Sequence, residues 1–431
     1  MRNYRAYTLQ TYKDISQISS ISEELREAIE IVGRVLPFKT NSYVVNKLIN
    51  WNNIPADPIF TLTFPRKEML TPEHYAGVKK LIEENNTEAL SKYIEEIRLG
   101  LNPNPSGQQH NIPEFDGEKL EGLQHKYRET VLLFPKQGQT CHAFCSFCFR
   151  WPQFSNMNDL KFSMKKEHDQ YLKYIKAHPE ITDILFTGGD PMVMSAKILS
   201  SYIEPLLKPE MSHIRTIRIG TKSLAYWPYR YTTDSDADEI ITLFEKIIRS
   251  GKHLSIMAHF NHYVELSTDE VKRAIRRIRT TGAQIRTQSP VLKHINDDPE
   301  IWHKMWQKQV ELGCIPYYMF IARETGAKHF FEIPLEQCQI IFRKAYQKVS
   351  GIARTVRGPS MSCNSGKIQI LGVNEVAGEK VFVMRFIQGR NPDWVGRPFF
   401  AKYDANATWI SQLKPAFDDE KFFYEGEFVY L

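Results

Sequence analysis

Three cysteines lie within one eight-residue segment, at Cys141, Cys145 and Cys148, and the other three of the chain are dispersed. The spacing is C-x3-C-x2-C. Three thiolates can ligate three irons of a [4Fe-4S] cubane and leave the fourth iron free, whereas electron carriers use four cysteines. A structural zinc ion would need a fourth thiolate or imidazole nearby, and only His142 lies inside the segment. The spacing favours an iron–sulfur cluster over zinc and over inert thiols.

A second element follows one predicted strand later. The segment Ile184–Pro191 is an apolar run that ends in Gly188 and Gly189, followed by Asp190. Glycine lets the main chain approach a ligand closely and frees its polar groups to face it. Alone this is weak evidence, because many strand-to-loop turns carry such residues. Next to the cysteine segment, it predicts a ligand-binding loop beside the cluster.

Together the two elements resemble the signature of the radical S-adenosylmethionine (SAM) enzymes. In that superfamily the open iron binds the amino and carboxylate groups of SAM, and reductive cleavage gives a 5′-deoxyadenosyl radical that the protein orients and shields. The resemblance implies that Cys141, Cys145 and Cys148 hold the [4Fe-4S] cluster. It also implies that Gly188–Asp190 contacts the amino group of SAM.

Further segments are similar to the lysine 2,3-aminomutase family, over about residues 50 to 390. The resemblance implies a radical SAM isomerase that also uses pyridoxal 5′-phosphate (PLP) and moves an amino group from Cα to Cβ, giving a β-amino acid. The similar segments are Trp51–Leu70, Leu123–Leu133, Ile217–Lys222, His259–His262 and Gln288–Leu292.

The resemblance also implies the PLP site. PLP needs a lysine for its resting Schiff base. The family's lysine follows a glycine-rich stretch after the barrel, and Gly358–Lys367 occupies the matching place with fewer glycines. Lys367 is therefore expected to bind PLP. Lys126 and Tyr127 match the family's Arg-Tyr pair and are expected near the phosphate.

Two residues are expected to line the SAM pocket on the same grounds. His259 and His262 both follow a predicted strand, and the family's adenosyl-facing role suits one of them. A lone histidine is more often a core or surface residue, so the sequence does not separate the two; His259 is the chosen candidate. Gln288 is the second residue expected to line the SAM pocket.

The substrate residues match the family only in part. Arg150 matches the arginine that binds the α-carboxylate, and a guanidinium fork suits that group. Lysine-specific members hold the ε-ammonium with two aspartates, whose places fall here on Arg323 and Ser360. A substrate ammonium would lack a partner there, which is costly for a buried charge. We therefore expect an acidic amino acid such as glutamate, although a one-residue shift would put Glu324 at the first position.

Several other functions stay open at this stage. The same cofactors could act on free lysine, on a protein-bound lysine, or in a non-mutase radical reaction on an amino acid. An iron–sulfur or zinc protein that binds without catalysis is the alternative from a different class. The Gly188–Asp190 element and Lys367 argue against it.

The spacing of the elements predicts an α/β fold that brings these residues together. Six strand-like runs, from Val131–Phe134 to Tyr317–Ile321, alternate with helical patterns, and after the first interval they recur every 30 to 40 residues. This predicts parallel strands with covering helices, and ligand sites where the strands end. Six such units suit an open barrel or a doubly wound sheet, and the resemblance to radical SAM enzymes implies the former, a partial (β/α)6 radical SAM barrel at residues 121–351. A mainly helical N-terminal region at 1–120 precedes it, and a strand-containing PLP-lysine segment and tail at 352–431 follows.

The composition limits the partners. The net charge of +6 is mild for 431 residues, and the basic run Lys272–Arg279 suits one solvated helix face, so nucleic acid is not expected. No apolar run approaches the length of a membrane span, and the first 13 residues lack a signal-like apolar region. A cytoplasmic enzyme is expected, with a flavodoxin- or ferredoxin-type reductant. The C-terminal zinc site of some family members is not expected, because Ala401–Leu431 has no cysteine; a homo-oligomer stays open.

Overall fold

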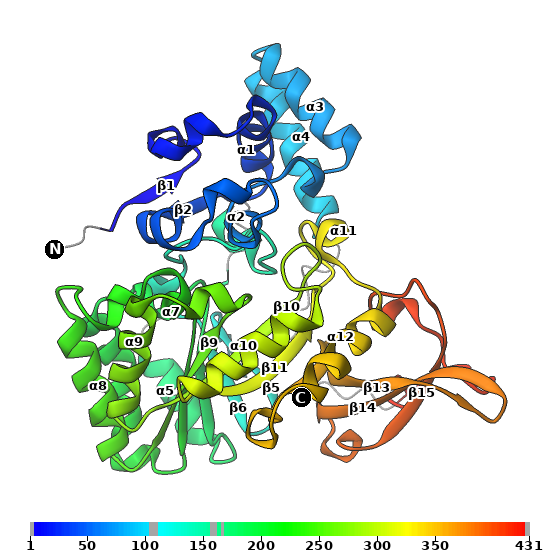
Figure 1. Cartoon of the computed structure of the whole chain (residues 1–431). Coiled ribbons are helices and arrows are strands. Elements are labelled where there is room, and N and C mark those ends of the chain that lie inside the picture. The colour runs from blue at the N-terminus through cyan, green and yellow to red at the C-terminus, as the bar shows by residue number, and fades with distance from the viewer. Residues whose placement is uncertain (1–3, 103–110, 156–161, 165–167, 427–431) are drawn as a thin grey trace.

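The computed structural model describes residues 4–102, 111–155, 162–164 and 168–426 (Figure 1). One sheet of eleven strands forms the centre of the molecule, in the order β15-β14-β13-β12-β11-β10-β9-β8-β7-β6-β5. The strands are β5 (Leu123–Tyr127), β6 (Thr130–Leu133), β7 (Asp183–Phe186), β8 (Thr216–Thr221), β9 (His253–His259), β10 (Gln284–Val291), β11 (Ile315–Ile321), β12 (Arg357–Ser362), β13 (Gly366–Val376), β14 (Glu379–Gly389) and β15 (Pro398–Lys402).

Strands β6 to β12 are parallel, and helices connect each to the next. A parallel pair needs such a crossover, because the chain must return to the same edge before it enters the next strand. The crossover helices are α5 (His168–Ala177), α6 (Ala196–Ile203), α7 (Ser223–Tyr226), α8 (Ala237–Arg249), α9 (Asp269–Thr280), α10 (Pro299–Glu311), α11 (Lys328–Phe331) and α12 (Leu335–Gln347).

The structure confirms the predicted α/β class and the six strands of the partial barrel. They correspond to β6–β11, with ends that differ by a few residues from those expected. The sequence analysis missed β12, which adds a seventh parallel strand beside β11. Strands β5 and β15 end the sheet at its two edges, so the barrel is open. The expected boundary at residue 351 is not an edge of the sheet, since β12–β15 continue it.

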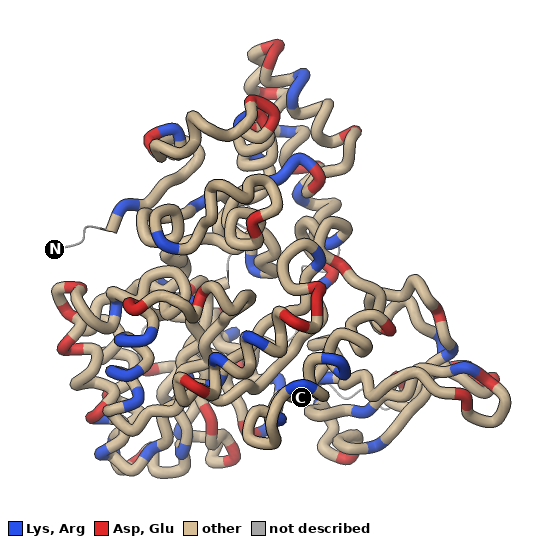
Figure 2. The backbone as a smooth tube through the Cα atoms, viewed as in Figure 1, with Lys and Arg blue, Asp and Glu red and all other residues tan. Residues whose placement is uncertain are grey.

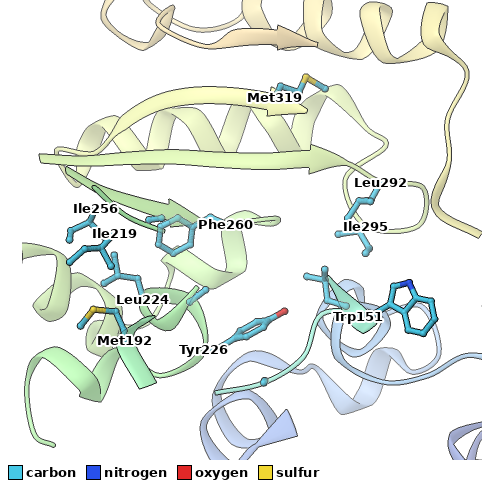
Figure 3. Packing of buried hydrophobic residues seen from close by; sticks show 14 of the residues in the cluster. Trp151, Met192, Ile219, Leu224, Tyr226, Ile256, Phe260, Leu292, Ile295 and Met319 are labelled. Carbon is cyan, nitrogen blue, oxygen red and sulfur yellow. The ribbon is translucent and has the colours of Figure 1, made fainter. Parts of the chain in front are cut away.

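Apolar side chains fill the space between the sheet and its helices. Ile219 on β8 lies opposite Ile256 on β9, and both lie near Leu224 of α7 and Phe260 (Figure 3). All four are fully buried. Burying an aliphatic or aromatic side chain of this size contributes about 1.5–3 kcal/mol, so this layer fixes the strands whose ends carry the site.

Helix α9 explains the basic run of the sequence. Its buried positions include Val271, Ala274, Ile275 and Ile278, which repeat at helical spacing and face the core. The basic residues occupy the remaining face, as predicted. Over the backbone as a whole, basic and acidic residues are interspersed (Figure 2). No described helix combines the length and apolarity needed to cross a membrane.

The N-terminal region packs over the cysteine segment and is mainly helical, as expected. Its first strands, β1 (Ala6–Thr8) and β2 (Lys39–Asn41), pair antiparallel. A short hairpin of β3 (Glu114–Phe115) and β4 (Glu118–Lys119) precedes β5. The helices are α1 (Glu23–Val35), α2 (Pro58–Thr63), α3 (Pro72–Glu83) and α4 (Thr87–Gly100).

Candidate active site

The loop after β6 carries the three clustered cysteines, and the N-terminal region holds its main chain. Phe144 N donates to the carbonyl of Lys39 over 2.7 Å, and Ser146 N donates to that of Leu62 over 2.9 Å. The Lys39 ammonium donates to the carbonyl of Cys141 over 2.8 Å. Elements more than 80 residues upstream therefore fix the shape of this loop.

The thiols of Cys141, Cys145 and Cys148 are free and lie close enough to influence one another. Burial, and then the Cys145 thiol, raise the pKa of Cys148 to about 12, and burial also raises the pKa of Cys141 and Cys145. A bound cation would offset this cost and stabilise the thiolates. Among the described residues no three His, Cys, Asp or Glu converge on one metal ion. In a cubane each thiolate binds a different iron, so three spaced thiols suit a cluster better than a zinc ion.

The glycine pair at the end of β7 lies directly against the segment that leads into the cysteine loop. Gly189 N donates to the carbonyl of Gly138, and Asp190 N donates to that of Thr140 over 2.7 Å. A β-carbon on Gly189 would lie 2.5 Å from the Thr140 oxygen, which no side chain tolerates. Gly188 has a φ of 140°, which also favours glycine. The two predicted elements are thus in contact.

The Asp190 carboxylate binds protein groups. It accepts hydrogen bonds from Met192 N (2.9 Å), Thr221 Oγ1 (2.7 Å) and Lys222 N (2.9 Å). Burial raises its pKa to about 6. The side chain therefore joins the ends of β7 and β8. The predicted contact of this element with SAM would fall to the main chain of Gly188–Asp190.

The structure distinguishes the two histidines that the sequence left equivalent. His259 ends β9, and its Nε2 lies 2.6 Å from the amide nitrogen of Gln288 on β10. Burial, and then the charge of Lys222, lower the pKa of His259 to about 3, so its imidazole is neutral. His262 instead accepts a hydrogen bond from Val264 N through Nδ1 (3.3 Å) and caps the turn after the strand. Of the two histidines, His259 is the one that lies beside Gln288, the other residue expected to line the SAM pocket.

A buried ion pair completes this side of the site. The Lys222 ammonium lies 2.7 Å from Glu265 Oε1 and 2.8 Å from Asn261 Oδ1. It also lies 4.4 Å from the centre of the Tyr226 ring, whose hydroxyl is 3.5 Å from Cys145 Sγ. The charge of Lys222 is therefore neutralised within the protein, and a hydroxyl reaches a cluster cysteine.

Lys367 lies in a cavity of about 890 Å³ between the sheet and the C-terminal segment. Its Nζ donates to Gln388 Oε1 over 2.7 Å and lies 5.3 Å from the ring centres of both Tyr127 and Tyr318. Burial, and then the charge of Arg218, lower the pKa of Lys367 to about 7. A lysine with such a pKa is a neutral nucleophile near neutral pH, as Schiff-base formation with PLP requires.

The predicted phosphate residues line the same cavity. Lys126 donates to the carbonyl of Cys363 and lies 5.4 Å from the centre of the Tyr127 ring. Burial lowers the pKa of Lys126 to about 7, so a phosphate beside it would favour the charged ammonium. Lys126, Tyr127 and Lys367, far apart in the sequence, are thus brought together in a way that fits PLP.

Arg150 and Arg323 lie against the same aromatic ring in this cavity. Their guanidinium carbons lie 5.0 and 4.7 Å from the centre of Phe149, which places them less than 10 Å apart. Arg323 donates to the carbonyl of Ser362 over 3.0 Å. Burial, and then repulsion from Arg323, lower the pKa of Arg150 to about 10. Among the described side chains, no carboxylate forms an ion pair with either arginine.

The prediction for Ser360 needs correction. Ser360 is fully buried within β12, its hydroxyl donates to the carbonyl of Met319 over 3.4 Å, and it does not line the cavity. Ser362 lines the cavity instead. Glu324, the alternative to Arg323, also lines it, but its carboxylate accepts a hydrogen bond from Ser411 over 2.9 Å.

The sequence analysis missed several residues that line the cavity. Arg218 and Arg357 come from the starts of strands, where only the folded sheet shows that they meet Lys367. The C-terminal tail also contributes to the wall of the cavity. Its residues 427–431 lie outside the described chain. The missed residues include Gln153, Asp183, Arg218, Tyr317, Arg357, Phe422, Tyr424 and Glu425.

The fold and the site define a class of enzyme. Three free cysteines follow the first parallel strand of an open β/α barrel, and a glycine pair from the next strand packs beneath them. This is the arrangement of a radical SAM enzyme. No protein-family model matches the chain.

Comparison with known proteins identifies the family. The chain is 34% identical over 397 residues to an Aquifex aeolicus protein named "Putative L-lysine 2,3-aminomutase", covering 92% of this chain and 93% of that protein. It is 27% identical to the L-lysine 2,3-aminomutase of Escherichia coli, over 61% of this chain and 71% of that enzyme. The chain belongs to the lysine 2,3-aminomutase family. The homologous aminomutases use a [4Fe-4S] cluster, SAM and PLP, as the sequence predicted.

Among solved structures, a radical SAM methyltransferase from Sphaerobacter thermophilus matches with a TM-score of 0.38 and 14% identity. The match covers 56% of this chain and 68% of that one. The barrel of this chain is defined by the parallel pairing of its own strands β6 to β12, independently of this match.

Proposed function

We propose that this protein is an aminomutase for an acidic amino acid, with glutamate preferred over aspartate. It moves the α-amino group to the β-carbon and produces a β-amino acid. The observation that carries the proposal is the pair Arg150 and Arg323, two guanidinium groups beside one ring and without a carboxylate partner among the described side chains. A substrate with two carboxylates would neutralise both.

The charge of the whole cavity supports the same substrate class. Its cations outnumber its acids, and Asp183 is already paired with Arg218 over 2.8 Å. A lysine substrate would bring another positive charge into a site whose described acidic groups are fewer than its cations and already accept hydrogen bonds within the protein. Like charges in a partly desolvated site repel strongly, so lysine is disfavoured. The cationic residues of the wall are Lys126, Arg150, Arg218, Arg323, Arg357 and Lys367.

Each residue has a defined part in this proposal. When bound, the cluster and SAM supply a 5′-deoxyadenosyl radical, and PLP supplies a ring that can delocalise the substrate radical. Arg150 binds the α-carboxylate and Arg323 the side-chain carboxylate, which together orient the β-carbon. Lys367 provides a neutral amine for PLP, and Lys126 with Tyr127 binds its phosphate.

The remaining groups serve the cluster and SAM. Cys141, Cys145 and Cys148 would hold the three ligated irons. His259 and Gln288 would line the SAM pocket. Reductive cleavage needs a one-electron donor of flavodoxin or ferredoxin type, and the free thiols need a reducing compartment such as the cytoplasm.

The proposal is tested with a panel of amino acids. Anaerobically reconstituted protein is incubated with SAM, dithionite and PLP, together with glutamate, aspartate, lysine or arginine. Mass spectrometry after derivatisation separates α- from β-isomers. We expect β-glutamate as the main product and no β-lysine. β-Lysine as the main product would overturn the acidic substrate, and no turnover of any amino acid would favour a non-mutase reaction.

A further inference from the structure

The side-chain amide of Gln153, three residues after Arg150, accepts a hydrogen bond through its oxygen, but its nitrogen has no partner among the described residues. Gln153 lies in the short 3-10 helix Trp151–Phe154, is 7% exposed and lines the cavity. Its Oε1 accepts a hydrogen bond from Phe162 N over 3.0 Å. Its Nε2 is enclosed, and none of the described groups accepts a hydrogen bond from it.

The orientation of this amide follows from its one partner. The main-chain N–H of Phe162 is a donor, so the amide oxygen must face it; the reversed orientation would bring two donors together. The nitrogen of Gln153 is thereby left as a donor without an acceptor in the part of the chain that the structure describes. Buried donors in folded proteins almost always have a partner, and an exception calls for an explanation such as a ligand.

Arg150, in the same turn, also has a buried hydrogen-bond donor without a described partner. Its Nη1 is also enclosed and has no partner among the described residues. The turn itself is closed by the hydrogen bond from Gln153 N to the carbonyl of Arg150, over 3.0 Å. Two unmet donors therefore arise from residues three positions apart that line one cavity. A carboxylate has two oxygens and can accept from both.

We propose that Gln153 binds the substrate α-carboxylate together with Arg150, with its amide N–H on one oxygen and the guanidinium on the other. Gln153 is then a substrate-binding residue that the cysteine motif and the aminomutase activity do not assign. Its oxygen is held by Phe162, so the donor is already oriented before the substrate arrives. The inference rests on the proposed function, because it assumes an amino-acid substrate.

The test compares two ligands that differ only in the α-carboxylate. Glutamate carries it, and 4-aminobutanoate lacks it but keeps the other carboxylate and the amine. Binding to cluster- and PLP-loaded protein is measured by calorimetry without SAM, so that no turnover occurs. We expect Gln153→Leu to weaken glutamate binding at least about tenfold, the usual effect of losing a hydrogen bond to a charged group. The affinity for 4-aminobutanoate should stay within about twofold, because the lost bond is absent from that complex.

A second variant guards against misfolding. Gln153→Glu keeps the acceptor for Phe162 N and exchanges only the donor for a negative charge, so it should fold and weaken glutamate binding more than Gln153→Leu. Gln309→Leu is the matched control. Gln309 is a buried glutamine of α10 that bonds Thr287 and does not line the cavity. This variant should lose stability but bind both ligands as the unmodified protein does.

The outcomes separate this inference from the proposed function. If both Gln153 variants bind glutamate as tightly as the unmodified protein, the role of Gln153 is wrong while the acidic substrate stands. If the unmodified protein binds lysine and not glutamate, the acidic substrate is wrong. The same comparison of lysine with 1,5-diaminopentane, which lacks the α-carboxylate, then decides the role of Gln153.

Discussion

The two sides of the site differ in how their polar groups are satisfied. On the side of the cluster and SAM, Asp190 binds Met192, Thr221 and Lys222, and the Lys222 ammonium is neutralised by Glu265. On the substrate side, buried cations line a cavity in which the described acidic groups are few and already engaged. The carboxylate and ammonium groups named on the first side are paired within the protein, whereas on the second side the cations outnumber the described acidic groups.

This difference shows how each side works. A satisfied hydrogen-bond network such as that around Asp190 and Lys222 is rigid, so it would hold the loops around a cluster and SAM without rearrangement. Buried cations that lie close together repel one another, and bound anions would relieve this repulsion. The phosphate of PLP and the two carboxylates of an acidic amino acid supply such anions. Under the proposed function, substrate specificity would depend on the cavity cations that have no carboxylate partner among the described residues, Arg150 and Arg323.

The largest effect is expected on the cluster side. Cys145→Ser removes one iron ligand and should abolish turnover and lower bound iron, because a hydroxyl is a poor cluster ligand. Iron content and visible absorption of the anaerobic protein measure this. Cys314→Ser, at a buried cysteine that does not line the cavity, should keep the full iron content. Full iron content in Cys145→Ser would show that the cluster is held elsewhere.

The unpaired cations predict an unusual dependence of stability on pH. The pKa of Lys367 falls from 10.5 to about 7 on folding, so between these values the unfolded chain binds more protons than the folded one. Lys367 by itself should therefore make the stability of the PLP-free protein rise with pH, by about 1 kcal/mol per unit over pH 7 to 10, and this share is the difference in slope between the unmodified protein and a variant without Lys367. Urea unfolding at several pH values measures the slope.

The matched variant is Lys367→Met, which removes the titrating group. The slope should become shallower, and the variant should be more stable than the unmodified protein at pH 7. The same variant should lose the borohydride-sensitive PLP absorption and keep the iron–sulfur absorption. A persistent PLP band would assign the cofactor to another lysine.

The contact between Gly189 and Thr140 allows a sharper test of the rigid side. Gly189→Ala puts a methyl group 2.5 Å from a carbonyl oxygen and should cost about 1–3 kcal/mol of unfolding free energy. Gly138→Ala is the control, since its nearest contact would be an ordinary 3.5 Å and the change should stay within about 0.5 kcal/mol. Equal stability of the two variants would contradict the tight packing of these elements.

The smallest effects should separate the two histidines. His259→Ala should weaken SAM binding about tenfold if this ring lines the pocket. His262→Ala removes a turn cap and should cost about 1 kcal/mol of stability without changing SAM affinity. Equilibrium binding of SAM and urea unfolding distinguish these results. A larger loss of SAM affinity in His262→Ala would reverse the assignment.

The sequence was most predictive for features formed by residues that are close together in the chain. Cys141, Cys145 and Cys148 are neighbours in the chain, and Gly188–Asp190 is one turn, so their spacing carries the chemistry. The parallel strands were predicted because each is a short apolar run between helical patterns. Lys367 was found only through family resemblance, since one lysine among dozens has no distinguishing neighbour in the sequence.

What the sequence did not predict depends on contacts between distant segments. Strand β12 contains Gly358 and Pro359, which disfavour a strand, and its pairing with β11 is decided by the tertiary structure. The match to the family placed Ser360 in the substrate site. In the structure Ser360 is buried within β12, and Ser362 lines the cavity instead. Nothing in the sequence indicated a role for Gln153, because the hydrogen-bond partners of a side-chain amide are known only from the folded structure.

The central claim is that Arg323 selects an acidic substrate, and the most direct measurement is kcat/KM for glutamate and lysine in Arg323→Asp. We predict a fall of about 100-fold or more for glutamate, the cost of replacing a carboxylate's partner by a like charge. The preference should shift toward lysine. Arg249→Asp, an equal charge change on the surface of α8, should leave both values unchanged. Full glutamate activity in Arg323→Asp would contradict the account.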